Sequence, residues 1–196
     1  MAFAQTISNE EVQALPAAQF DGEIVVVDSR EALERACEYL RRQRVLGFDT
    51  ETRPSFTANH INKVSLLQLS TYGRCYLIRL CAVRASGHLR SVLERSDIIK
   101  IGAAVSGDIN SLHKIMDFTP RGFVDLQNEA GKFGIAEKSL RKMSGIVLGE
   151  RVSKAQRLSN WEASTLTGKQ QLYAATDAWV CLRIYDALRA ASSSER

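Results

Sequence analysis

The chain has 196 residues, with 26 Lys and Arg against 22 Asp and Glu, and a formal net charge of +4. A composition that is 45% hydrophobic and 24% charged is typical of a single globular domain. It excludes a disordered chain, a collagen-like repeat and a disulfide-framed mini-protein. Basic clusters at 41–44, 138–142 and 151–157 are compatible with a nucleic-acid partner, although charge alone equally describes solvated helix faces.

The start of the chain shows no targeting pattern. Residues 1–11 contain neither a basic segment with a long apolar run nor a stretch able to span a bilayer. The four cysteines form no C-x-x-C pair and have no histidine partner at zinc-finger spacing, so they are expected to be reduced thiols. We therefore expect a cytoplasmic protein with no membrane partner.

In chain order, the first half of the sequence predicts mostly strands. A β-branched run at 24–28 is followed by Asp28 and Glu31, a pair typical of a helix start, and then by apolar residues at helical spacing. Three further apolar runs predict strands, at 45–50, 64–70 and 75–78. A tight turn joins the last two of these strands.

The second half of the sequence predicts mostly helices. The expected short elements are a helix at 89–93, a strand at 98–104, a helix at 107–116 and a strand at 122–124. Thr167 and Gln170 form a capping box, from which periodic apolar residues continue to Leu188 and predict a long final helix. These elements together predict an α/β domain with a mixed central sheet and flanking helices.

Two carboxylates lie at the end of the apolar strand at 45–50. Asp49 and Glu51 are two residues apart, so the period of a strand sends both side chains to the same face. Two like charges side by side on a core strand are destabilising unless a cation lies between them, and Mg²⁺ or Mn²⁺ prefers such oxygen ligands. The alternative is a strand that has already emerged into solvent, where acids are tolerated.

Two later segments add further acids. Asp108 follows an apolar strand and a small-residue bend, and in isolation an acid at a helix start is a routine cap. Tyr173 and Asp177 are four residues apart in the final helix, so they share a face that continues with apolar residues up to Leu188. An acid on such a stripe is unfavourable unless it is paired or bound to a metal.

These residues follow the order Asp-x-Glu, Asp, Tyr-x-x-x-Asp along the chain. The segments 48–52, 102–112 and 173–179 resemble the three motifs of DEDDy-type 3′–5′ exonucleases, in the branch that contains ribonuclease D and the Werner-syndrome exonuclease domain. The segments 65–69 and 159–162 also resemble that branch. The resemblance covers nearly the whole chain.

The resemblance implies a ribonuclease H-like three-layer exonuclease fold. Its expected boundaries are an N-terminal extension at 1–22, an exonuclease domain at 23–190 and a frayed tail at 191–196. The implied activity is hydrolysis of phosphodiester bonds from the 3′ end of DNA or RNA, with release of nucleoside 5′-monophosphates.

The same resemblance implies a site with two divalent cations, Mg²⁺ or Mn²⁺. The implied ligands are the four acids Asp49, Glu51, Asp108 and Asp177. Two such ions stabilise both the attacking and the leaving oxygen of an in-line displacement. Tyr173 is implied to orient the attacking water, because an ordinary pKa of about 10 makes a tyrosine a poor base at neutral pH.

Three residues near the first motif are expected to line the terminal base or ribose: Phe48, Thr50 and Phe56. Core packing explains the two phenylalanines equally well. Asp125 is expected to cap the next helix. Two other functions stay open, a catalytically silent nucleic-acid-binding module on the same fold and a metallo-phosphoesterase of small nucleotides. The presence of all four acids favours the exonuclease.

Overall fold

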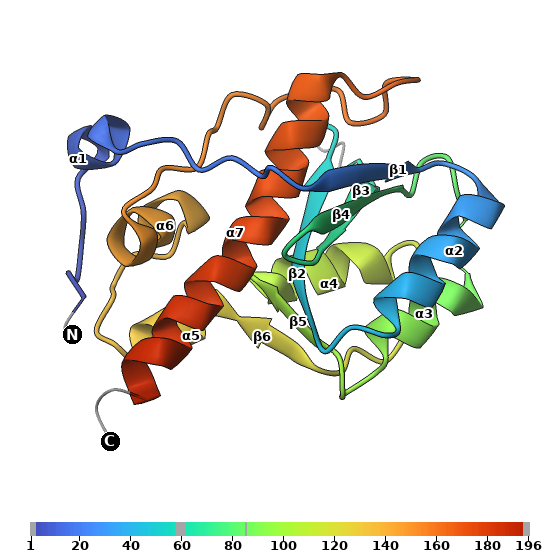
Figure 1. Ribbon diagram of the computed structural model, residues 1–196. Coiled ribbons are helices and arrows are strands. Elements are labelled where there is room, and N and C mark those ends of the chain that lie inside the picture. The colour runs from blue at the N-terminus through green and yellow to red at the C-terminus, as the bar shows by residue number, and fades with distance from the viewer. Residues whose placement is uncertain (1–2, 58–61, 85, 194–196) are drawn as a thin grey trace.

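The computed structural model describes residues 3–57, 62–84 and 86–193. At its centre is a six-stranded sheet in the order β1-β4-β3-β2-β5-β6 (Figure 1). The strands are β1 (Glu23–Val27), β2 (Val45–Thr52), β3 (Val64–Ser70), β4 (Arg74–Arg79), β5 (Ile99–Gly102) and β6 (Phe123–Asp125). Among these described strands only β3 is antiparallel to its neighbours, so the sheet is mixed, as the sequence predicts.

Helices cover both faces of the sheet and make three layers (Figure 1). They are α1 (Asn9–Ala14), α2 (Arg30–Leu40), α3 (Gly87–Leu93), α4 (Val105–His113), α5 (Leu126–Gly131), α6 (Leu140–Leu148) and α7 (Gly168–Ser193). The helices α2, α3 and α4 pack on one face of the sheet. The long helix α7 crosses the other face, and α5 and α6 pack beside it.

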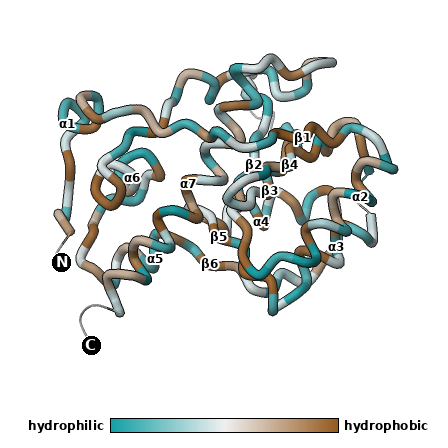
Figure 2. Tube along the Cα trace, viewed as in Figure 1, coloured by the Kyte–Doolittle hydropathy of each residue, from teal (hydrophilic) through white to brown (hydrophobic). Residues whose placement is uncertain are grey.

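Alternation along β2 gives each face of the sheet its own core. Phe48 is fully buried and packs with Leu67 in the cluster on the α2 side, whereas Val45 packs in the cluster under α7. Figure 2 shows hydrophobic residues concentrated on the strands. Asp49 and Glu51 have the same parity as Val45, so both carboxylates face α7.

The helix α7 approaches β2 closely because small residues line the contact. Ala174, Ala175 and Ala178 of α7 are fully buried. A Cβ atom added to Gly47 of β2 would lie 1.9 Å from the carbonyl oxygen of Ala178. The two backbones therefore meet directly, and the neighbouring Asp177 is held over β2.

Two helices begin at other residues than the sequence suggests. Ser29 caps α2, because its Oγ accepts a hydrogen bond from the N–H of Ala32 at 3.2 Å, so the expected cap at Asp28 is wrong. The helix α4 begins at Val105, two residues before the expected start. Its start depends on a contact with the distant residue Asp125.

The final helix begins as predicted. The N–H of Gln170 donates to Oγ1 of Thr167 at 3.2 Å, and the N–H of Thr167 donates to Oε1 of Gln170 at 3.0 Å. Residues 191–193 continue α7, and residues 194–196 lie outside the described ranges. Although α7 has 26 residues, no helix in the described part of the chain carries an apolar stretch sufficient to cross a membrane.

The N-terminal segment packs against the α7 side of the molecule. Val12 of α1 is fully buried, and a Cβ atom added to Gly145 of α6 would lie 3.3 Å from its side chain. Phe20 is also buried, and its N–H donates to Oγ1 of Thr176 in α7 at 3.2 Å. The segment before β1 is therefore in contact with both α6 and α7.

Candidate active site

Three carboxylates meet where α7 crosses the end of β2. Asp49 and Glu51 reach this point from the strand, and Asp177 reaches it from the helix. One ligand oxygen from each carboxylate lies within 4.8 Å of the corresponding oxygens of the other two. The close contact of α7 with Gly47 makes this convergence possible.

A fourth carboxylate, that of Asp108, comes from α4 on the opposite face of the sheet. The hydroxyl of Thr50 donates to its Oδ1 at 2.5 Å. Asp108 is outside the group of three, yet its charge raises the pKa of both Asp49 and Glu51. The acids of all three sequence segments therefore gather around one end of β2.

Burial raises the pKa of each of these carboxyl groups, and repulsion between the acids adds to it for Asp49, Glu51 and Asp177. Burial, followed by the charge of Asp108, raises the pKa of Asp49 to about 8. Burial and the neighbouring acids raise the pKa of Glu51 to about 9, and the pKa of Asp177 also lies well above its usual range. Burial raises the pKa of Asp108 to about 6, against the hydrogen bond from Thr50. Four ionised carboxylates this close together repel one another and destabilise the fold. A bound cation would offset that repulsion.

Tyr173 lies one helical turn before Asp177. Burial raises the pKa of its phenol, and the charges of Asp177 and Glu51 raise that pKa further. The hydroxyl stays protonated at neutral pH, so it can donate a hydrogen bond but is a poor base. The ring of the fully buried Trp161 lies 6.0 Å from the Tyr173 ring and restricts its position.

Two cavities adjoin the acids and share Tyr173 and Asp177 in their walls. One cavity of about 380 Å³ also includes Asp49, Glu51 and a lysine, Lys138. The other, of about 280 Å³, has two cationic residues in its wall, Arg151 and Lys169. Positive side chains therefore lie beside the acidic cluster in both cavities. The sequence places Lys138 and Arg151 in basic clusters, whereas no local pattern singles out Lys169.

The three residues expected to contact a substrate have different environments. Phe48 is fully buried with its ring 5.2 Å from that of Phe123, which corrects the expectation, because a core ring offers no surface to a substrate. Thr50 lines the larger cavity and uses its hydroxyl to hold Asp108. Phe56 is 86% exposed after the end of β2, and its contact with a substrate stays a prediction.

Comparison with known proteins now identifies the family. A profile described as 3′-5′ exonuclease matches residues 24–191. The chain belongs to this exonuclease family.

Similar exonucleases come from longer proteins. The chain is 34% identical over 188 residues to the bifunctional 3′-5′ exonuclease/ATP-dependent helicase WRN of Mus musculus, covering 89% of this chain and 13% of that protein. It is 28% identical over 193 residues to the exonuclease mut-7 homolog of Aedes aegypti, covering 86% of this chain and 27% of that protein. The chain therefore corresponds to a minor part of these relatives.

A solved exonuclease domain has the same architecture. The structure of the Aedes aegypti Nibbler EXO domain is 25% identical and superposes with a TM-score of 0.82, over 98% of this chain and 94% of that one. This likeness confirms the ribonuclease H-like fold that the sequence motifs imply.

The ligand atoms that the three clustered acids offer fit a divalent cation. The group of three consists of carboxylates, which are the hard oxygen ligands that Mg²⁺ and Mn²⁺ prefer. The Oδ1 atom of Asp177 is buried and has no hydrogen-bond partner among the described residues. A buried oxygen without a partner is unfavourable, and a cation would satisfy it. The three carboxylates could therefore hold a metal ion.

Asp125 fixes the start of the helix that carries Asp108. Its carboxylate accepts hydrogen bonds from the N–H groups of Ala104 and Val105, both at 3.1 Å, and from that of Gln127 at 2.9 Å. It caps α5, as the sequence predicts, and it also caps α4. Ala104 has a φ of +59°, a left-handed conformation that costs about 1–2 kcal/mol in a residue with a Cβ atom. The bonds to Asp125 offset that cost.

Replacing Asp125 by alanine is expected to lower the free energy of unfolding by about 2 kcal/mol, because three backbone N–H groups lose their acceptor. Adding Ala104→Gly is expected to recover about 1 kcal/mol, since glycine adopts the left-handed conformation without strain. Urea unfolding of the parent, both single variants and the double variant measures these differences. An unfolding midpoint unchanged by Asp125→Ala would contradict this role.

Proposed function

We propose that this chain is a metal-dependent 3′–5′ exonuclease of the DEDDy type. It would remove nucleotides from the 3′ end of a nucleic acid and release nucleoside 5′-monophosphates. The observation that supports this best is the convergence of four acids from three distant segments, together with a tyrosine in the motif order: Asp49, Glu51, Asp108, Tyr173 and Asp177.

Asp49, Glu51 and Asp177, with Asp108 from the other side of β2, would hold two Mg²⁺ or Mn²⁺ ions. When bound, these ions would supply activation of water and stabilisation of charge on the leaving 3′ oxygen. The protonated Tyr173 would donate a hydrogen bond to the attacking water and so orient it. The high pKa values of the carboxyl groups mean that they must lose protons before they can bind a metal.

The cations beside the acids suit a substrate that carries phosphates. Phosphates approaching an acidic cluster are repelled unless positive side chains hold them. Lys138 lines the larger cavity, and Arg151 and Lys169 line the smaller one. A strand with several phosphates could use these cations while its terminal phosphodiester reaches the acids.

The test uses 5′-labelled single-stranded DNA and RNA of the same sequence, with Mg²⁺ or Mn²⁺. The expected result is a ladder that shortens from the 3′ end and a nucleoside 5′-monophosphate product. An oligonucleotide with a blocked 3′ end should remain intact. Internal cuts, or shortening from the 5′ end, would contradict the proposal. The polymer that is hydrolysed faster, DNA or RNA, identifies the preferred substrate.

The same assay separates the two other candidate functions. A catalytically silent binding module would retain the oligonucleotide in the presence of metal without shortening it. A small-nucleotide phosphoesterase would hydrolyse a mononucleotide ester faster than it shortens the polymer. The four acids favour the exonuclease over the silent module, because loss of an acid is the usual sign of lost activity on such a fold.

Metal is expected to stabilise the protein, and more strongly at high pH. The pKa values of about 8 for Asp49 and about 9 for Glu51 exceed the ordinary 3.8 and 4.5, so the folded state binds more protons than the unfolded state. The stability of the metal-free protein therefore falls as the pH rises from about 5 to 9. A metal at a hundred times its Kd adds about 2.7 kcal/mol, or roughly 5–10 °C in Tm for a chain of this size.

Thermal unfolding in EDTA and in saturating Mn²⁺, at about pH 6 and about pH 9, measures both effects. The Asp49→Asn, Asp177→Asn double variant serves as the control, because it removes two of the proposed ligands while it keeps their shape. A metal-induced rise in Tm that is equal in the parent and this variant would place the metal elsewhere.

A further inference from the structure

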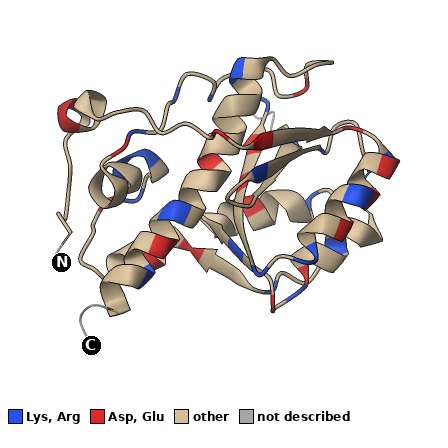
Figure 3. Cartoon of the chain, in the orientation of Figure 1, with Lys and Arg blue, Asp and Glu red and all other residues tan. Residues whose placement is uncertain are grey.

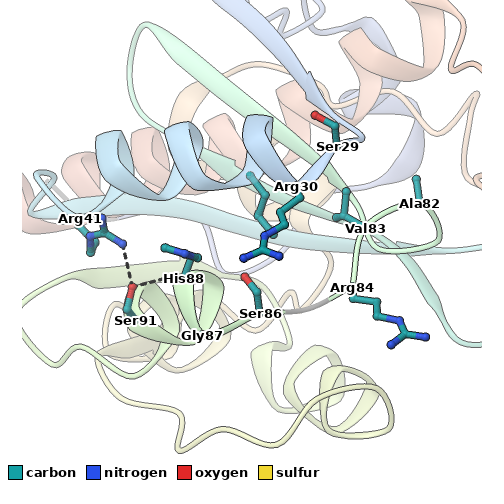
Figure 4. Close-up of a pocket in the computed structure, with 11 residues that line it drawn as sticks. Ser29, Arg30, Arg41, Ala82, Val83, Arg84, Ser86, Gly87, His88 and Ser91 are labelled. Carbon is teal, nitrogen blue, oxygen red and sulfur yellow. Dashed lines mark hydrogen bonds between the residues drawn. The ribbon is translucent and has the colours of Figure 1, made fainter.

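A second basic cavity lies on the α2–α3 side of the molecule, and its wall shares no residue with the cavities beside the acids. It has a volume of about 820 Å³ and lies between α2, α3 and the connection from β4 (Figure 4). Its cationic side chains are Arg30 and Arg41 at the two ends of α2 and Arg84 of the connection, and His88 of α3 also lines it. Figure 3 shows Lys and Arg positions along these helices.

Carboxylates neutralise these cations only in part. The described wall of the cavity contains no Asp or Glu. Outside it, Glu34 pairs with Arg30 at 3.0 Å and lies 3.6 Å from His88. The guanidinium of Arg41 donates to a serine hydroxyl of α3 at 3.1 Å and, within the described ranges, pairs with no acid. Arg84 likewise has no ion-pair partner among the residues that the structure describes. Positive charge therefore remains available to a ligand.

A buried hydroxyl in the same wall also lacks a partner. The Oγ atom of Ser86 is buried and makes no hydrogen bond to any described residue. Figure 4 shows the side chain of Arg30 extending toward it. The guanidinium supplies N–H donors that a phosphate oxygen accepts, and the hydroxyl in the same wall has no competing partner among the described residues.

The spacing of the arginines indicates what kind of anion would fit. Arg30 and Arg41 are eleven residues apart, which places them on the same face of the helix and about 16 Å apart along its axis. One phosphate cannot contact both, whereas a chain of phosphates can. The described wall includes no Phe, Tyr or Trp, so it offers no large aromatic ring on which bases would stack.

We propose that this basic cavity binds the phosphate backbone of a nucleic-acid strand, as a second contact outside the carboxylate site. The inference rests on the proposed function for its choice of polymer. The contact is to the backbone and therefore independent of base sequence, and it adds affinity only for strands long enough to reach it.

The test compares two variants that lose three cations each. One carries Arg30→Gln, Arg41→Gln and Arg84→Gln, and the matched control carries Arg90→Gln, Lys132→Gln and Arg189→Gln, which lie outside the cavity. Fluorescence anisotropy measures binding of a labelled strand of ~20 nucleotides in EDTA over a range of salt concentrations. Thermal unfolding first shows that each variant is folded, and Arg84→Gln alone, at an exposed side chain, serves if the triple variant is not.

The cavity variant is expected to bind the long strand roughly tenfold more weakly than the control. Its slope of log affinity against log salt is expected to be shallower by about 0.7 for each phosphate that the variant no longer binds. In hydrolysis assays KM should rise for the long strand and stay unchanged for a strand of ~4 nucleotides, with kcat unaltered for both.

Equal affinity and equal salt slope in the cavity variant and the control would overturn the inference. The inference is also overturned if inorganic phosphate binds this cavity while the three substitutions leave the affinity for the long strand unchanged. The cavity would then be a site for small anions. Binding that depends on the three arginines, without any hydrolysis by the parent, would refute the proposed function and leave this inference standing. Hydrolysis by the parent, with an unchanged KM for the long strand in the cavity variant, would support the proposed function and refute this inference.

Discussion

Replacing Asp49 and Glu51 together by alanine is expected to abolish hydrolysis of an oligonucleotide, with kcat reduced at least about 1000-fold. That loss corresponds to about 4 kcal/mol of transition-state stabilisation, a plausible contribution for a metal site that has lost two of its ligands. The two side chains supply two of the three carboxylates that lie within 4.8 Å of one another. Initial rates with Mg²⁺ and with Mn²⁺ measure the effect, and a double variant that degrades as fast as the parent would contradict the proposed site.

Substitutions at the same two positions are expected to raise the stability of the metal-free protein, although they abolish activity. The isosteric pair Asp49→Asn and Glu51→Gln removes charges that repel Asp177 and Asp108. Without metal at about pH 9 this variant is therefore expected to have a higher Tm than the parent. Glu10→Gln is a matched control, because α1 contributes no residue to either cavity beside the acids. Loss of both activity and stability would indicate damage to the fold instead.

Replacing Gly47 by valine is expected to have the second large effect. A Cβ atom at this position would lie 1.9 Å from the carbonyl oxygen of Ala178, and neither backbone can yield without moving α7. Overpacking of this kind costs about 1–3 kcal/mol and occasionally more. Because Asp177 adjoins the contact, a displacement of about 1 Å in α7 should also lower kcat about 100-fold.

Urea unfolding and initial rates on the same preparation measure the two consequences of Gly47→Val. Gly131→Ala in α5 is the control, because a Cβ atom there meets no atom within 4 Å. It should leave activity unchanged and, by favouring the helix, raise stability by up to about 1 kcal/mol. Parent-like activity in Gly47→Val would show that the direct contact of the two backbones is not needed to place Asp177.

The parts of the fold that depend on local sequence could be predicted. The alternation of a strand is enough to send Asp49 and Glu51 to one face, and the structure puts both toward α7. The capping box of Thr167 and Gln170 involves residues three apart, and both of its hydrogen bonds are present. The strands were recognisable because β-branched and apolar runs are short and bounded by turns.

Contacts between distant segments could not be read from such patterns. The start of α4 depends on Asp125, which lies twenty residues beyond Val105 and fixes Ala104 in a left-handed conformation. The alternation of β2 turns Phe48 to the face opposite Asp49 and Glu51, but the sequence does not show that α2 and its neighbours cover that face. The place of Lys169 beside the acids likewise follows from how α7 crosses the sheet, and from no periodicity of its own.

The N-terminal segment shows that sequence similarity and the minimal folding unit have different limits. The match to the family profile begins at residue 24, yet Val12 and Phe20 are buried and the N–H of Phe20 donates to Oγ1 of Thr176, the residue before Asp177. A shortened polypeptide that began at residue 24 would leave apolar surface of α6 and α7 open to water and remove a support next to the acids. The residues before the family match are thus part of the scaffold that positions the carboxylates.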